Sequence, residues 1–570
     1  MSVVSEQPPR TPKRTRAAAD RQAEASVSSS SLTSAALEDE KSPLLTETAT
    51  ETPSAGLLVA TEVLAADPDG SAFAANRTDP IVKSSVTYWI AAAIALAFGL
   101  LRTKVTAVAV GPHGLGIVSQ LNNVALVLGA VSVLGVPVFG ARALARARAQ
   151  HDRDAERSVI RFILTAPLLC AVLLVLFALL FRQQLSTAVV GSSAYGLGLL
   201  MALLSVPFNI AFTALQTLQQ GRDNASRFNR TVVVAAVGNL IVVVPLVVIW
   251  GFRGAELAML ATSVVLFAVA ARSAPSDLRQ VSLRGLRLGV TERTLLRAGI
   301  ASVVLGTLVL GVETALRSRL GHLHGFRAVG LYQPASLLST QMFLQFDLGI
   351  TLFLTTKLSA SLALGDDHAV RSSISSALRL GLLVGTPLML LCVGGRSVIV
   401  TTLFTGSFHG GQQAIALQMG GEFLRMISFV LGTVLISAGR IRAWFAVNLL
   451  PLLLQFAVGW MLLPHMGINA LPVSFVLAYG LTTITVMLVI ARLPVLRPSS
   501  REVWMTGACA TVLAIAIAGV VMSPTLWLDA CVCAIAVAIP LACSTSSERR
   551  IVRGRLGHIM NYAAPRVRRA

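Results

Sequence analysis

The stretch VTYWIAAAIALAFGLLRTKVTAVAV, at residues 86–110, is almost wholly apolar, and its charged side chains, Arg102 and Lys104, lie toward its end. The sequence GPHGLG follows at residues 111–116 and has the glycines and proline of a tight turn. A helix of about 20 apolar residues crosses the hydrocarbon core of a bilayer, which is about 30 Å thick. The stretch therefore predicts a transmembrane helix, after which the chain reverses direction.

Similar apolar runs continue along the chain. They predict an all-α, polytopic membrane protein with about 14 transmembrane helices. The runs lie near 86–110, 117–141, 159–181, 194–219, 230–250, 254–271, 297–318, 331–356, 374–394, 414–438, 443–463, 467–491, 504–522 and 525–543.

The composition excludes a soluble globular protein. Hydrophobic residues make up 54% of the 570, charged residues only 13%, and the mean hydropathy is +0.73, whereas an ordinary soluble domain has about 25% charged residues. The 47 basic residues outnumber the 27 acidic ones, but in the apolar body they fall in short gaps between runs instead of on a polar face. This distribution argues against a nucleic-acid partner and favours membrane topology.

The basic gaps also predict an orientation. Most basic residues after Lys83 lie in alternate gaps, such as 142–158 and 272–296, and in the C-terminal segment. Because positively charged loops stay on the cytoplasmic side, we expect a multi-pass protein of the inner (plasma) membrane with both termini cytoplasmic.

The two ends differ from the apolar body. The first 83 residues are rich in Ser, Thr, Ala, Pro and charge, and they lack an apolar run long enough to span a bilayer. That composition is typical of a disordered tail and offers no sign of a cleaved signal peptide. The predicted organisation is a cytoplasmic tail at 1–83, an N-terminal lobe at 84–272, a cytoplasmic linker at 273–296, a C-terminal lobe at 297–492, two additional helices within 493–545, and a basic cytoplasmic tail at 546–570.

The chain repeats itself at an offset of about 214 residues, which predicts two related lobes. Leu101-Arg102-Thr103-Lys104 corresponds to Leu316-Arg317-Ser318-Arg319. Each copy holds six spans, an even number, so both copies begin on the same side of the membrane and the repeat is parallel. Further matches are Gly111 with Gly325, Gly116 with Gly330, Asp152 with Asp366, Arg157 with Arg371, Gly221 with Gly439, and Gly251 with Gly467.

Several short motifs, taken in order, carry a family resemblance. They are Gly111-Pro112-His113-Gly114-Leu115-Gly116, Leu218-Gln219-Gln220-Gly221-Arg222, Gly330-Leu331-Tyr332-Gln333 and Gly421-Glu422-Phe423-Leu424-Arg425. Together they resemble the Wzx-type polysaccharide flippases of the multidrug/oligosaccharidyl-lipid/polysaccharide exporter superfamily, over about residues 86–495. The resemblance implies a transporter that moves an undecaprenyl-diphosphate-linked oligosaccharide from the cytoplasmic to the outer leaflet by alternating access.

Four cations are the candidate substrate-binding residues: Arg102, Lys104, Arg317 and Arg319. Charges inside a membrane helix are costly, and the repeat places these pairs symmetrically in the two lobes. Arginine presents a planar fork that matches phosphate oxygens, so the four side chains are suited to a diphosphate or acidic sugars. The alternative is that they only anchor the helices at the interface by snorkelling.

Charged residues found in the second copy are the candidate ion-coupling residues: Glu313, Asp347, Glu422 and Arg425. Glu313 with Arg317 and Glu422 with Arg425 have the spacing of local ion pairs, which is their simplest explanation. Asp347 has no evident local partner. A carboxyl group in apolar surroundings favours its protonated form, so Asp347 is a candidate proton or cation site.

The expected partners are the lipid-linked oligosaccharide, membrane lipids and enzymes of polysaccharide biosynthesis. The six cysteines and eight histidines show no metal-site spacing, so we expect neither a metal nor another cofactor, and no catalysis. One alternative function is a multidrug antiporter of the same superfamily, whose cationic substrates a basic cavity would repel. The other is a membrane-embedded glycosyltransferase or polysaccharide polymerase, which would require acidic catalytic residues and a large outer loop.

Overall fold

The computed structural model describes residues 78–543, apart from 223, 279–289, 494–495 and 524. Within these ranges the regular structure is entirely helical. The expected disordered tail therefore lies outside the described residues as far as residue 77, and helix α3 begins at Thr78. The expected basic tail at 546–570 also lies outside the described residues.

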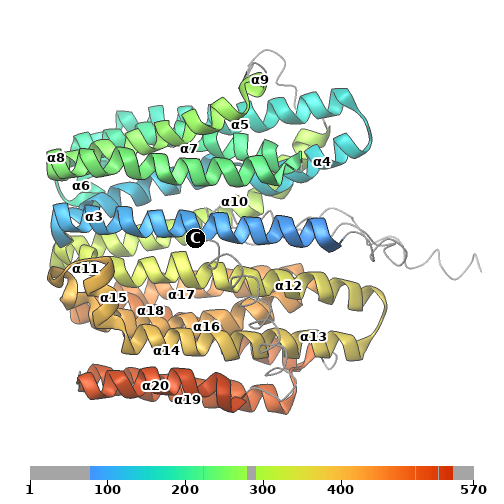
Figure 1. Cartoon of the computed structure of the whole chain (residues 1–570), viewed down its shortest axis with the longest axis vertical. Coiled ribbons are helices and arrows are strands. Elements are labelled where there is room, and N and C mark those ends of the chain that lie inside the picture. Colours follow the sequence, from blue (N-terminus) through green and yellow to red (C-terminus); the bar gives the residue numbers. More distant parts are fainter. Residues whose placement is uncertain (1–77, 223, 279–289, 494–495, 524, 544–570) are drawn as a thin grey trace, which may run out of the picture. The chain divides into compact units, whose positions relative to one another are not determined.

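The long helices of the first half are α3, α5, α7 and α8, and the helices of the second half begin with α10 (Figure 1). Their bounds are α3 (Thr78–Ser132), α4 (Ala141–Ala149), α5 (Arg153–Leu180), α6 (Arg182–Val190), α7 (Gly196–Gly221), α8 (Ala225–Ser273), α9 (Pro275–Leu278), α10 (Val290–His324), α11 (Phe326–Leu338), α12 (Leu344–Ala363), α13 (Asp367–Leu380), α14 (Thr386–Gly394), α15 (Arg396–Leu403), α16 (Gln412–Ser437), α17 (Ile441–Met466), α18 (Ala470–Ala491), α19 (Ser500–Met522) and α20 (Leu526–Cys543). Short π-helical segments, η1 (Val136–Gly140), η3 (Ser339–Phe343) and η4 (Gly381–Gly385), continue neighbouring helices.

Two of the longest helices contain sharp reversals at glycine. Gly111 in α3 has φ 63° and Gly251 in α8 has φ 54°, a region that residues with a Cβ rarely adopt. Helix α8 therefore holds two of the predicted spans, and α3 holds the first span and most of the second. The predicted run 117–141 is interrupted by a turn at residues 133–135, where Leu134 and Gly135 have positive φ, before the helix resumes at Val136. Among the described residues, eight helices are long and apolar enough to cross a membrane by length and composition. The predicted fold class, an all-α polytopic membrane protein, is confirmed.

The backbone confirms the internal repeat. Gly111 and Gly325 both have positive φ at the turn after the first span of each half, and Gly251 (φ 54°) and Gly467 (φ 53°) match in the same way. At the opposite ends of the helices, Asp152 caps α5 and Asp366 caps α13. In each cap the carboxylate accepts hydrogen bonds from the backbone N–H groups two and three residues on. The same local geometry is therefore built twice.

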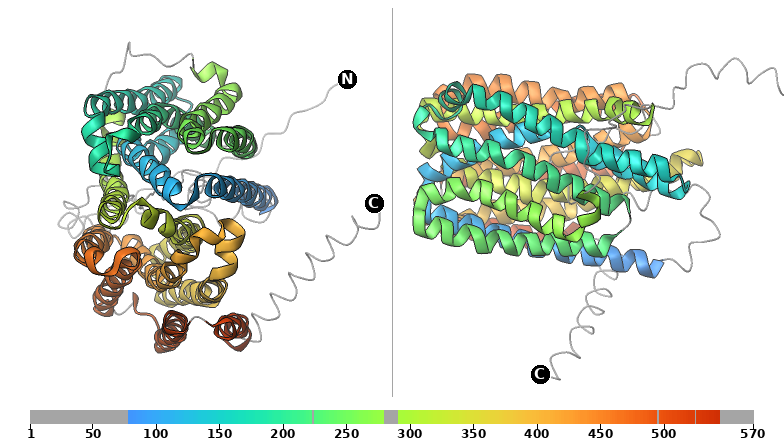
Figure 2. Two further views of the ribbon diagram at one scale, coloured as in Figure 1. Left: turned by 90° about the vertical axis from the view of Figure 1, so that its left-hand side faces the viewer. Right: turned by 90° about the horizontal axis from the view of Figure 1, so that it is seen from above.

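Helices pack mainly within their own half. In the first half α8 packs against α3 and α7, and α5 against α7. In the second half α16 and α17 both pack against α18, while α12 packs against α16. The two additional helices follow at the end of the chain, where α20 packs along α14 and α19 against α16 (Figure 2).

The halves meet where α3 crosses α11, through two glycines that the repeat pairs. A Cβ on Gly116 would overlap the Phe326 carbonyl oxygen, and a Cβ on Gly330 would overlap the Pro112 carbonyl oxygen. Each glycine thus lies against the backbone of the other half. This reciprocal contact is what two lobes related by a local twofold axis produce.

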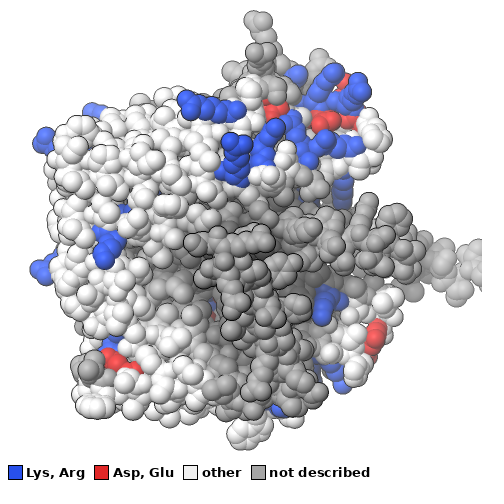
Figure 3. Space-filling model, viewed as in Figure 1, with Lys and Arg blue, Asp and Glu red and all other residues white. Residues whose placement is uncertain are grey.

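The two ends of the helices differ in charge. We call the end that carries α6, Gly111 and Gly325 the α6 end, and the end that carries α4 and the Asp152 cap the α4 end. On the face in Figure 3, basic side chains gather at the α4 end over α4 and α5. At the α4 end, the buried Asp277 of α9 also forms a bidentate ion pair with Arg222. Two guanidinium nitrogens of Arg222 lie 2.6 and 2.8 Å from the carboxylate oxygens of Asp277. This contact raises the pKa of Arg222.

Candidate functional site

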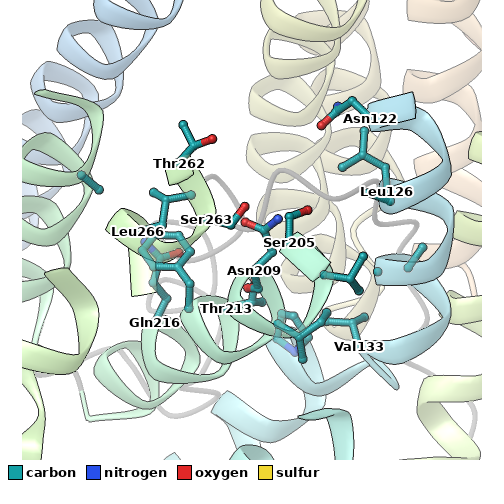
Figure 4. A pocket seen from close by; sticks show the side chains of 18 of the residues that line it. Asn122, Leu126, Val133, Ser205, Asn209, Thr213, Gln216, Thr262, Ser263 and Leu266 are labelled. Atoms are coloured by element: carbon teal, nitrogen blue, oxygen red, sulfur yellow. The ribbon is translucent and has the colours of Figure 1, made fainter. Parts of the chain in front are cut away.

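A cavity of about 530 Å³ lies among the helices of the first half and is closed on one side by α10. We call it the N-terminal cavity. Its apolar wall is interrupted by uncharged side chains that donate and accept hydrogen bonds, which Figure 4 shows arranged around the opening. These are Asn122, Ser205, Asn209, Thr213, Gln216, Asn239, Thr262 and Ser263, and Figure 4 labels all of them except Asn239.

One helix supplies half of this polar lining. Ser205, Asn209, Thr213 and Gln216 follow one another on α7 at intervals of three or four residues, so they share one face of the helix. The hydroxyls of Ser205 and Thr213 donate to backbone carbonyls within α7, at 2.7 and 2.9 Å. The side-chain amides of Asn209 and Gln216 form no hydrogen bond to another residue of α7, so they are free to bind a ligand.

Among the described residues that line the N-terminal cavity, Arg102 is the one with a charged side chain. It lies on α3 in the first half, half-buried, and forms no ion pair with any of the described residues. Lys104, two residues further along α3, is also half-buried but does not line this cavity. A lone guanidinium beside neutral amides and hydroxyls suits a ligand that carries both an anion and hydroxyl groups.

Arg317, which the repeat pairs with Arg102, is in a different environment. It is fully buried on α10, and its guanidinium contacts the Glu313 carboxylate and the Ser336 hydroxyl. It also donates to Gln333 Oε1 at 3.2 Å and lies 5.2 Å from the centre of the Tyr332 ring. The local Glu313–Arg317 pair expected from the spacing is therefore formed.

A second buried charge cluster surrounds Arg425 on α16. Its Nε lies 3.2 Å from Asp347 Oδ2, and its Nη2 lies 2.5 Å from Glu422 Oε2. The second contact is the expected local pair, whereas Asp347 finds its partner 78 residues away in the chain. The other carboxylate oxygen of Asp347 is buried and has no hydrogen-bond partner in the described part of the chain.

Neutral side chains connect the two charge clusters. The Tyr332 hydroxyl donates to Gln418 Oε1 at 3.1 Å, and Gln418 donates to Glu422 Oε1 at 3.0 Å. The Ser339 hydroxyl also contacts Glu422. Because Tyr332 lies against Arg317 as well, a polar path runs from Glu313 to Asp347 through the second half. We call this path the C-terminal network.

Arg319 is separate from both sites. Its guanidinium stacks on the Trp460 ring, 3.9 Å from the ring centre, and it lines a second cavity. The four cations predicted to bind substrate thus do not share one site. Arg102 lines the N-terminal cavity, Arg317 belongs to the C-terminal network, Arg319 stacks on Trp460, and Lys104 is half-buried on α3 and lines neither cavity. Of the four predicted ion-coupling residues, Asp347, Glu422 and Arg425 meet directly, and Glu313 joins them through the network.

Sequence reasoning missed the neutral polar lining, although the spacing of Ser205, Asn209, Thr213 and Gln216 inside an apolar run was a usable signal. It also missed Glu256, a buried carboxylate on α8 that lies against Gly198 of α7. No group of His, Cys, Asp and Glu in the described ranges is arranged to hold a metal ion.

No model of a known protein family and no curated protein matches the chain, but solved structures do. The structure of the lipid II flippase MurJ in an inward closed conformation matches with a TM-score of 0.63 at 11% identity, covering 83% of this chain and 100% of that one. Two structures of a multidrug resistance MATE family transporter of the MOP superfamily, in different conformations, also match. The inward-facing structure has a TM-score of 0.57 at 14% identity, and the match covers 71% of this chain and 98% of that one. The outward-facing structure has a TM-score of 0.54 at 13% identity, and the match covers 78% of this chain and 98% of that one. The chain thus has the fold that MOP superfamily transporters share.

Proposed function

We propose that this protein is a flippase that moves an undecaprenyl-diphosphate-linked oligosaccharide from the cytoplasmic to the outer leaflet by alternating access. The fold and its structural neighbours, a lipid II flippase and multidrug transporters, support a membrane transporter. The specific substrate is the one that the sequence resemblance implies, and the lining of the N-terminal cavity supports it. No chemical transformation is required, and the carboxylates of the C-terminal network are held in ion pairs instead of facing a substrate.

The lining of the N-terminal cavity is the observation that carries the proposal. Asn122, Asn209, Gln216 and Asn239 present amides, and their neighbours present hydroxyls. Amides can donate and accept at once, so they suit sugar hydroxyls, which do the same. At about 530 Å³ the cavity is within the usual range for small-ligand sites and can take part of a glycosylated head group.

Arg102 supplies the charge that such a head group needs. Its guanidinium forms no ion pair with the described residues, so binding a diphosphate would not break an existing pair. Charge-assisted hydrogen bonds to phosphate are about twice as strong as neutral ones. In this proposal Arg102 holds the phosphate, the amides hold the sugars and the lipid chain stays in the bilayer.

The C-terminal network is proposed to couple transport to an ion or proton. Asp347, Glu422 and Arg425 form one buried unit, and Asp347 keeps one oxygen unpaired. A proton or cation at that oxygen would change the balance of charge around Arg425. This change would pass through the hydrogen bonds of Gln418 and Tyr332 to Arg317 on α10. Helix α10 also borders the N-terminal cavity, which Val303 and Gly306 line.

The site of action is proposed to be the inner (plasma) membrane, with both termini on the cytoplasmic side and enzymes of polysaccharide biosynthesis as partners. The basic α4 end would then face the cytoplasm. In a background without native cysteines, a cysteine within 142–158 should react with an impermeant reagent only in permeabilised cells. A cysteine within 405–410 should react in intact cells, and reversed labelling would refute this orientation.

A multidrug antiporter is the second candidate, because MATE transporters share the fold. The cavity lining argues against it: Arg102 is cationic, and none of the described carboxylates lines the cavity to attract an organic cation.

A reconstituted transport assay separates the two functions. Proteoliposomes containing the wild-type protein should flip a fluorescent lipid-linked oligosaccharide, measured by an impermeant quencher, and should not move ethidium. Replacing both Asn209 and Asn239 by Leu should lower the flipping rate more than tenfold, because hydrogen bonds to the sugars are lost. Ethidium transport without lipid flipping would refute the proposal and favour the antiporter.

A further inference from the structure

A second cavity, of about 600 Å³, lies between the two halves near the α6 end. We call it the interlobe groove. The first half lines it with apolar side chains of α3 and α6, and the second half with α10 and with Trp460 of α17. The apolar wall consists of Val124, Val127, Leu128, Leu185, Val189 and Leu323.

The groove is distinct from the N-terminal cavity. Helix α3 separates the two: Asn122, Ala125 and Leu126 line the N-terminal cavity, whereas Val124, Val127 and Leu128 line the groove. None of the described residues lines both cavities.

Hydrogen bonds between α10 and the first half run alongside the groove. Ser318 donates to the Ala188 carbonyl at 2.8 Å, and Gln120 donates to the Thr314 carbonyl at 2.7 Å. A molecule in the groove would therefore contact both halves at once.

Arg319 supplies a cation at this apolar surface. Its guanidinium lies 3.9 Å from the centre of the Trp460 ring, and its buried Nε has no hydrogen-bond partner in the part of the chain that the structure describes. None of the described carboxylates pairs with it, whereas Arg317, two residues earlier, is paired with Glu313. Stacking on tryptophan offsets only part of the cost of a cation in apolar surroundings. The groove therefore has a free charge that an anion would complement.

The position of Arg319 indicates which anion is available. It lies one and a half turns before the end of α10 at His324, in the same part of the groove as the exposed His322. Helix ends that carry tryptophan and arginine lie at the level of the lipid head groups. A phosphate at that level can reach Arg319, while an acyl chain continues along the valines and leucines of the groove.

We propose that the interlobe groove holds one anionic glycerophospholipid, with its phosphate on Arg319 and one acyl chain between α3, α6 and α10. The bound lipid contacts both halves and stabilises them in the arrangement seen here. Rocking of one half against the other would change the width of the groove and release the lipid. Anionic lipid thus acts on the conformational equilibrium without entering the N-terminal cavity.

The test uses the purified full-length protein and phosphatidylglycerol as the probe. Native mass spectrometry should show one tightly bound phosphatidylglycerol, and added phosphatidylglycerol should raise the thermal unfolding midpoint more than phosphatidylcholine does. Arg319→Gln should weaken the tight binding at least tenfold, because a charge-assisted contact is lost. Arg327→Gln, which removes an exposed arginine at the start of α11, is the matched control and should bind like the wild type.

A second variant tests the apolar part of the groove while keeping the charge. Val127→Trp fills the path of the acyl chain and should also abolish tight binding. Equal binding of phosphatidylglycerol by the wild type and Arg319→Gln would overturn the proposal. So would displacement of the bound lipid by undecaprenyl diphosphate at equal concentration, because the groove would then be a site for the transported lipid.

Discussion

The two halves of this protein repeat the same backbone turns and caps but bury different chemistry. Around α7 the first half has a cavity lined with amides, hydroxyls and Arg102. Around α16 the second half buries Arg425 in ion pairs with Asp347 and Glu422, and one oxygen of Asp347 has no hydrogen-bond partner among the described residues. Duplication therefore preserved the fold while the interior diverged. In our proposal the first half receives the polar ligand, and the buried charges of the second half couple transport to an ion or proton.

Removing the central cation of the C-terminal network should give the largest effect. Arg425→Ala leaves Asp347 and Glu422 as two buried carboxylates without their cation, and breaking a buried pair in this way costs about 3–5 kcal/mol. We expect a marked fall in the thermal unfolding midpoint of the purified protein. In the first half Asn209→Ala should change it little, because Asn209 is only half-buried beside an open cavity.

A compensating variant sharpens this prediction. Combining Arg425→Met with Asp347→Asn and Glu422→Gln removes all three charges together, so no buried charge is left alone. The thermal midpoint should recover toward the wild-type value. If Arg425→Ala melts like the wild type, these residues are not the buried, coupled unit described above.

Neutralising one carboxylate should affect transport more than stability. Asp347→Asn keeps the size of the side chain but removes the charge beside Arg425 and the site for a proton or cation. The response of lipid flipping to an imposed ion or proton gradient should fall more than tenfold, while substrate binding stays near the wild-type level. A gradient response that survives in Asp347→Asn would remove this residue from the coupling role.

A smaller effect should follow from a methyl group at the contact between the halves. Gly330→Ala would overlap the Pro112 carbonyl, and crowding of this kind costs about 1–3 kcal/mol. Gly432→Ala, in α16, is the control because a Cβ there meets nothing within 4 Å. The thermal midpoint should drop for the first variant only. Equal midpoints would mean that α3 and α11 do not cross closely at this point.

The sequence predicted the fold better than the site, for a physical reason. The length of each apolar run is set by the thickness of the bilayer, and the turns at Gly111 and Gly325 are local, so both can be recognised without neighbours. The Glu422–Arg425 pair is also local on one helix. The contact of Arg425 with Asp347 joins residues 78 positions apart, and no spacing rule predicts such a partner.

The substrate-binding prediction shows the same limit. Arg102 and Arg317 occupy equivalent places in the repeat, so the sequence treats them alike. Their environments differ because Glu313 and Ser336 surround Arg317, whereas neutral side chains from α7 and α8 lie around the cavity that Arg102 lines. Equivalent positions in a repeat share a backbone and can still differ in every side-chain contact.

The most direct test of the account compares Arg102→Ala with Arg317→Ala in lipid flipping and thermal unfolding, at matched protein levels. Arg102→Ala should reduce flipping more than tenfold and leave the thermal midpoint almost unchanged, and Arg102→Lys should restore flipping only in part because the planar fork is lost. Arg317→Ala should lower the midpoint, because Glu313 loses its partner. Full flipping activity in Arg102→Ala, or equal losses of stability in the two alanine variants, would contradict the assignment of substrate binding to the first half.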